Sequence, residues 1–117
     1  MLVDTSIWVD HLRARDTRLA QALEDGLVWT HPFVIGELAC GNLAKRGEVL
    51  GLIGALPSAP VADHEEVFAF VESRRLMGRG LGWVDMHLLA SAVLAAVPLL
   101  TSDKNLSIVA RALRLDP

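Results

Sequence analysis

Short apolar runs alternate along this chain with segments that have helical periodicity. The runs that suit buried strands are Met1–Val3, Leu27–Trp29, Pro60–Ala62 and Leu99–Thr101. Because strand–helix alternation favours right-handed crossovers, it predicts a parallel sheet covered by helices on both faces. We therefore expect an α/β fold with three layers, in which a central, mainly parallel sheet of about four or five strands is flanked by helices.

Capping residues set the expected helix boundaries. Thr5 or Ser6 is expected to cap the first helix, which follows the first apolar run. Pro32 suits the first turn of a later helix, because proline needs no amide partner there. Asp63 followed by Glu66 resembles a capping box and predicts the start of another helix at that point.

Length and composition predict one domain over residues 1–117. The 117 residues are 52% hydrophobic, which is ample for a core. The start MLVDTS has no basic region followed by a long apolar stretch, so we expect a cytoplasmic protein without a secretory signal. The longest uncharged stretch, 86–102, is interrupted by Pro98 and is too short for a membrane span. The single cysteine, Cys40, has no disulfide partner and is expected in the core.

The net charge argues against general binding of polyanions. A formal charge of -3 provides no surplus of Lys and Arg for phosphate contacts. One bound divalent cation would change that charge from -3 to -1, and a second would change it to +1. A metal would therefore alter the balance locally.

Four acids interrupt otherwise apolar surroundings. They are Asp4 in LVDTS, Glu37 in VIGELA, Asp85 in GWVDMHLLAS and Asp103 in LLTSDKN. Each acid alone is more simply a helix cap or an exposed helix residue. Helical spacing is nevertheless expected to turn Glu37 and Asp85 inward. Clustered carboxylates in apolar surroundings must protonate, find cations or bind a metal, and oxygen-only ligands favour magnesium or manganese.

The four segments VDTS, GELACGN, WVDMHLLASA and TSDKN carry a resemblance to a known family. Across essentially its whole length, the chain resembles PIN-domain ribonucleases of the VapC toxin family. The resemblance implies a PIN-like fold in which Asp4, Glu37, Asp85 and Asp103 surround one or two Mg²⁺ or Mn²⁺ ions. We expect Asp4 and Asp85 to be the most direct ligands. Asp103 would complete the site directly or through water, and Glu37 would orient or activate water.

The same resemblance implies a function and partners. It implies the toxin of a type II toxin–antitoxin system, acting as an endoribonuclease that hydrolyses RNA phosphodiester bonds, with transfer RNA as a suggested substrate. A VapB-like antitoxin that covers the acids and a homodimer are also implied. Three alternatives stay open at this point: a housekeeping RNA-processing PIN nuclease, a catalytically silent PIN interaction module and a phosphate-receiving signalling domain.

Further polar and aromatic residues are candidates for supporting roles. Hydrogen bonds to the carboxylates or to phosphate are expected from Thr5, Ser6, Thr101 and Asn105, although capping explains Ser6 better. Arginines near the start and before the glycine-rich turn either contact the RNA backbone or line solvated helix faces; they are Arg13, Arg15, Arg18, Arg74, Arg75 and Arg79.

Aromatic side chains and histidines give weaker signals. Trp83, beside Asp85, is the best candidate for stacking on an RNA base, with core filling as its alternative. The four histidines have no paired spacing, and most are expected at the surface or the core edge.

Overall fold

Two short parallel strands lie at the centre of the structure, a computed structural model that describes residues 1–117. Strand β1 spans Leu2–Val3 and strand β2 spans Leu99–Leu100. Leu2 pairs with Leu99, and Val3 pairs with Leu100. All four side chains are buried, so the strands join the two ends of the chain inside the core.

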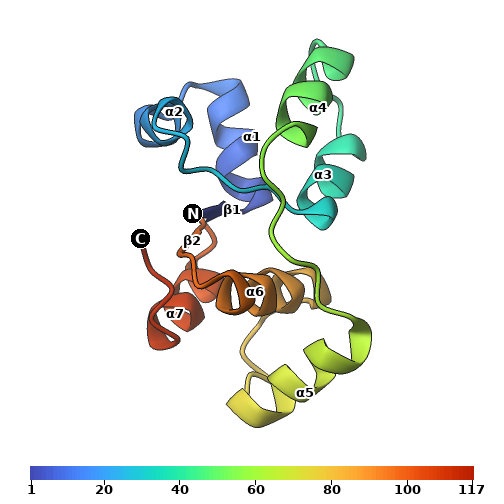
Figure 1. The fold of residues 1–117 in the computed structure, drawn as a ribbon, viewed down its shortest axis with the longest axis vertical. Helices are drawn as coiled ribbons and strands as arrows, with labels where there is room; N and C mark the ends of the chain where they lie inside the picture. The colour runs from blue at the N-terminus through green and yellow to red at the C-terminus, as the bar shows by residue number, and fades with distance from the viewer.

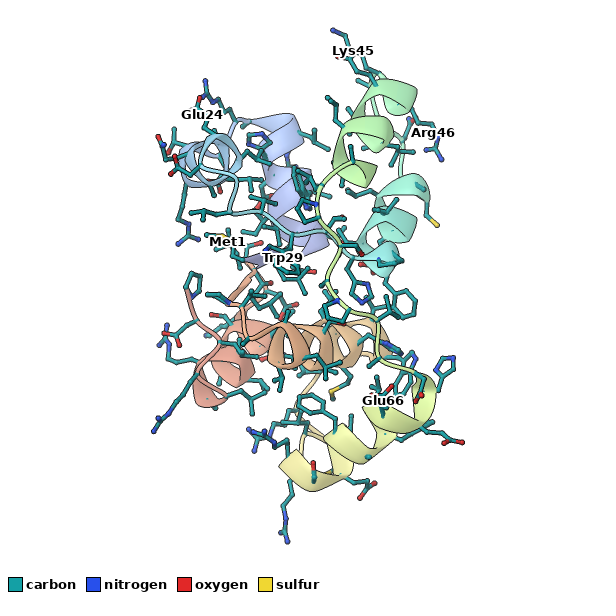
Figure 2. All side chains as sticks on the ribbon, in the orientation of Figure 1. Met1, Glu24, Trp29, Lys45, Arg46 and Glu66 are labelled. Atoms are coloured by element: carbon teal, nitrogen blue, oxygen red, sulfur yellow. The ribbon has the colours of Figure 1, made fainter.

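Extended segments continue this pairing on one side as single bridges. Leu2 forms a parallel bridge with Trp29, and Thr30 forms another with Ser58. The amide of Trp29 donates to the carbonyl of Met1 at 2.8 Å, and Figure 2 labels these two neighbouring residues. The expected sheet of four or five strands is therefore only partly formed as regular strands. The predicted strand at 60–62 is absent, because the pairing occurs earlier and Pro60 has no amide to donate.

Helices cover both sides of the strands. They are α1 (Thr5–Arg13), α2 (Thr17–Glu24), α3 (Pro32–Ala39), α4 (Arg46–Gly54), α5 (His64–Arg74), α6 (Trp83–Ala95) and α7 (Lys104–Ala112). Figure 1 shows α1 to α4 on one side of the strands and α6 and α7 on the other, with α5 packed beyond α6. This arrangement confirms the α/β class. No helix combines the length and apolar character needed to cross a membrane.

Local capping chemistry explains most helix starts. Pro32 is the first residue of α3, and Asp63 and Glu66 form the predicted capping box of α5. The expected cap of α1 was wrong, because Asp4, and neither Thr5 nor Ser6, occupies that position. Its carboxylate accepts a hydrogen bond from the Thr5 amide at 2.8 Å. Aspartate caps a helix as well as serine does, and here it directly follows the strand.

Two expectations about burial were also wrong. Cys40 is exposed, because α3 ends at Ala39 and places Cys40 at the C-cap, outside the buried stripe of that helix. His31 and His87 are only 0% and 1% exposed, so two of the four histidines belong to the core.

Candidate active site

Asp4 is the most enclosed of the four candidate acids. It follows β1, its amide donates to the Leu100 carbonyl at 2.9 Å, and the residue is only 7% exposed. Its Oδ2 atom accepts hydrogen bonds from the hydroxyls of Ser6 at 2.8 Å and Thr101 at 2.7 Å. With the Thr5 amide on Oδ1, three donors fix this carboxylate in one orientation.

The two hydroxyls join the ends of β1 and β2 into one site. The Thr101 hydroxyl donates to Asp4 and accepts from the Asp103 amide at 3.0 Å. The Ser6 hydroxyl donates to Asp4 and accepts from the Ser102 amide at 3.1 Å. Ser6 therefore does not cap α1, contrary to the sequence-based expectation, and it links the first turn of α1 to the loop after β2.

Glu37 reaches the site from α3. Its Oε1 atom accepts a 2.6 Å hydrogen bond from the Thr5 hydroxyl, which ties α3 to the first turn of α1. The expectation that Glu37 turns into the core was wrong, because Glu37 is an exposed residue. The core stripe of α3 passes through Val34 and Leu38, and Glu37 lies beside that stripe.

Asp85 is affected by the charges of the three other acids. It is the third residue of α6 and accepts a hydrogen bond from the Gly82 amide at 2.9 Å. Burial raises the pKa of Asp85 above its usual value, the Gly82 bond opposes this, and the charges of Asp4, Asp103 and Glu37 raise it further. All three other acids therefore lie close enough to affect Asp85.

The oxygen atoms at this site suit a hard divalent cation. Oδ1 of Asp85, Oδ2 of Asp103 and Oε2 of Glu37 accept no hydrogen bond, while the other oxygen of each carboxylate does. These oxygens, with Asp4, are the ligand type that magnesium and manganese prefer. No three acidic, histidine or cysteine side chains form a ready-made metal cluster, so the carboxylates would have to move closer to share an ion.

The glycine-rich loop before α6 packs against the start of α7. Gly80 has a φ of +77°, which favours glycine. A Cβ atom there would also lie 2.7 Å from Nδ2, the side-chain nitrogen of Asn105. Asn105 itself is exposed and makes no hydrogen bond to a carboxylate. Its expected role as a donor to the acids or to phosphate stays a prediction.

Comparison with known proteins identifies the family. The family model described as PIN domain matches residues 1–112, from β1 to the end of α7. The matched span holds all four acids and the hydroxyls that position Asp4. This chain belongs to the PIN-domain family.

Two curated relatives refine that assignment. Both are named Ribonuclease VapC32, from Mycobacterium tuberculosis strains CDC 1551 / Oshkosh and ATCC 25618 / H37Rv. Each is 50% identical over 107 residues, which cover 91% of this chain and 86% of the relative. This PIN-domain protein is therefore a homologue of a VapC ribonuclease, and the sequence-based recognition is confirmed.

The candidate RNA-binding residues of this PIN domain lie in different surroundings. Arg13 pairs with Asp10 at 3.2 Å on the exposed face of α1, whereas Arg15, Arg75 and Arg79 are exposed and form no ion pair. Trp83 is half-buried and stacks on His64 with ring centroids 5.6 Å apart and planes inclined by 19°. One face of the indole is therefore already covered, which favours a packing role, and base stacking stays a prediction.

His31 is a positioning residue that sequence reasoning missed. Its Nδ1 accepts from the Phe33 amide at 3.0 Å and so caps α3, the helix that carries Glu37. The proton must then reside on Nε2, which lies 3.1 Å from the Ser91 hydroxyl of α6, the helix that carries Asp85. The signal was its place immediately before Pro32, where a helix cap is expected.

The pH dependence of stability should report on His31. Burial, and then the charge of His87, lowers the pKa of His31 from 6.5 to about 4. The folded state thus disfavours the proton, so its stability is greatest above the unfolded pKa and falls as pH decreases toward 4. We expect a loss of about 2 kcal/mol between about pH 7 and pH 5, measured by urea denaturation.

A neutral cap separates His31 from the other histidines. His31→Asn keeps a capping side chain without a titratable ring, so it should flatten this part of the pH dependence relative to the wild type. An unchanged pH dependence in His31→Asn would contradict the assignment.

Proposed function

We propose that this PIN-domain protein is a cytoplasmic toxin of a type II toxin–antitoxin system and an endoribonuclease that requires Mg²⁺ or Mn²⁺. The main support is the hydrogen-bonded Asp4 carboxylate at the ends of both strands, beside which the charges of Asp4, Asp103 and Glu37 raise the pKa of Asp85. A relative at 50% identity named a ribonuclease supports RNA as the substrate. The intact acidic set argues against a silent interaction module.

Each acid has a distinct part in the proposed mechanism. Asp4 and Asp85 are the main ligands of one or two divalent cations, and Asp103 completes the set directly or through water. Such a cation supplies Lewis-acid stabilisation of the phosphate and of the attacking water. Glu37 uses its free Oε2 to orient that water and take its proton, while the Thr5 hydroxyl holds Oε1 in place. Ser6 and Thr101 keep Asp4 oriented, so this one ligand is arranged before RNA arrives.

Metal dependence tests the proposal directly. The purified protein is expected to cleave single-stranded RNA in Mg²⁺ or Mn²⁺ and to lose all activity above background when a chelator removes the ion. Readdition of either cation should restore cleavage, which gel electrophoresis of a labelled RNA would measure. Undiminished cleavage in chelator, after exhaustive dialysis, would refute the proposed chemistry.

The toxin role includes an antitoxin and a homodimer as partners. An apolar groove of about 330 Å³ runs between α1, α2 and α4, and only His11 among its lining side chains is polar. Trp8 and Leu12 line it from positions one and two turns after Asp4 on α1. We place an amphipathic helix of the antitoxin in this groove, because an antitoxin segment seated there would continue along α1 to the acids.

A growth experiment would distinguish a toxin from a housekeeping nuclease. Expression of a toxin should arrest growth, and co-expression of the short gene directly upstream should relieve the arrest.

A further inference from the structure

A second cavity, with a polar lining, lies between β2, α2 and α7. Its volume is about 190 Å³, and its polar lining includes Arg18, Thr101, Ser107 and Arg111. Leu99, Leu100 and Ala110 form its apolar part, and Asp116 and Pro117 also line it. Arg18 is one of the arginines that the sequence suggested as RNA contacts, whereas Arg111 is not among them.

The polar side chains of this cavity match the chemistry of a phosphate group. Neither Arg18 nor Arg111 forms an ion pair or a side-chain hydrogen bond, although the Asp116 carboxylate lines the same cavity. Arg18 lies in the first turn of α2, where a positive charge opposes the helix dipole, so helix stability does not explain it. Two free guanidinium groups and the Ser107 hydroxyl offer the planar, multiple donors that phosphate oxygens accept.

The cavity is connected to the candidate active site through two elements. Thr101 lines the cavity and donates to Asp4, so the two sites share a residue. On α7, Asp103, Ser107 and Arg111 follow one another at intervals of one turn along one face. The helical rise sets Arg111 about 12 Å along the axis from Asp103, so a strand that passes the acids can follow this face.

We propose that this cavity binds a backbone phosphodiester of the RNA next to the one that is cleaved. The inference rests on the proposed function, because it assumes that RNA reaches the acids. A chain with a formal charge of -3 repels RNA overall, and the four carboxylates of the candidate site repel it locally until a cation binds, so a cationic contact away from the acids favours RNA binding. Arg18 and Arg111 supply that contact and set the direction of the strand along α7.

The double variant Arg18→Gln/Arg111→Gln tests the subsite. With a synthetic RNA that carries a 5′-hydroxyl, we expect KM to rise about tenfold while kcat stays unchanged. In binding measurements by fluorescence anisotropy in chelator, the slope of log affinity against log salt should fall in magnitude by about 1. Arg111→Lys retains the charge but loses the planar donors, so it should raise KM less and keep the salt slope.

Matched variants control for charge and folding. Lys45→Gln/Arg114→Gln removes the same charge at residues outside the cavity, and Lys45 projects from the outer end of α4 (Figure 2). It should keep the wild-type KM, because neither residue touches the cavity. An equal KM rise in this control, or an unchanged KM and salt slope in Arg18→Gln/Arg111→Gln, would overturn the subsite.

The outcomes also separate this inference from the proposed function. Variants of the acids should lose kcat but retain the salt slope of RNA binding, whereas the arginine variant should show the reverse. If the acid variants cleave RNA normally, the active-site assignment fails, and the salt slope of the arginine variant still decides the subsite. If the arginine variant lowers kcat without changing KM or the salt slope, Arg18 and Arg111 do not bind RNA in the ground state, and the subsite is overturned.

Discussion

Replacement of Asp85 by asparagine is expected to abolish RNA cleavage, and the same change at Asp4 should do so as well. Each substitution removes a charge that the proposed cation needs while it keeps the size of the side chain. We expect kcat to fall by at least about a thousandfold, because several kcal/mol of transition-state stabilisation depend on a correctly held cation. Cleavage of a labelled RNA at saturating Mg²⁺ measures the loss.

Asparagine is chosen because it separates catalysis from folding. Asn caps helices as well as Asp does, so Asp4→Asn should keep α1 and stay folded, with a lower melting temperature because its side-chain NH2 group cannot accept the two hydroxyl hydrogen bonds. Asp16→Asn is the matched control, because Asp16 caps α2 in the same way and lies outside the acidic set. Wild-type cleavage by both Asp4→Asn and Asp85→Asn would rule out this active site, as would an equal loss in Asp16→Asn.

Replacement of Leu52 by glutamate is expected to prevent neutralisation by the antitoxin. Leu52 lines the groove between α1, α2 and α4 and is 67% exposed, so the change should not disturb the core. A helix that buries an apolar face there would have to desolvate the new carboxylate. We expect antitoxin affinity, measured by isothermal titration, to fall at least about a hundredfold.

The matched control is a similar leucine outside the groove. Leu94 is 54% exposed near the end of α6, and Leu94→Glu should bind the antitoxin like the wild type. Both variants should cleave RNA normally, because neither residue belongs to the acidic set. Tight binding by Leu52→Glu would move the antitoxin to another surface.

Local chemistry made some of the fold predictable. The pair Asp63 and Glu66 and the proline at position 32 set their helix starts through interactions within one turn, which a sequence displays directly. The extent of regular strand was not predictable, because β1 pairs with residues that lie almost the whole chain away. Apolar runs identify extended segments, but their pairing decides whether a run forms two strand residues or one bridge.

The candidate site shows the same division. The four acids were named in order from their motifs, and the pKa of Asp85 supports their proximity. Periodicity failed for Glu37, because its partner Thr5 belongs to another helix and holds the carboxylate at the protein surface. The expectation that most histidines lie at the surface failed for His31, whose two ring nitrogens bond to a backbone amide and to a distant serine.

The helix starts around the acids have a consequence for the metal-free protein. Asp4 and Asp103 cap α1 and α7, and Asp85 lies in the first turn of α6, so three helix dipoles present their positive ends to the carboxylates. Backbone amides thereby offset part of the repulsion that a cation would otherwise have to relieve. Folding therefore does not depend on the proposed cation, although catalysis would. In a cell short of divalent ions, the protein would be folded but inactive, and it would need no refolding when the ions return.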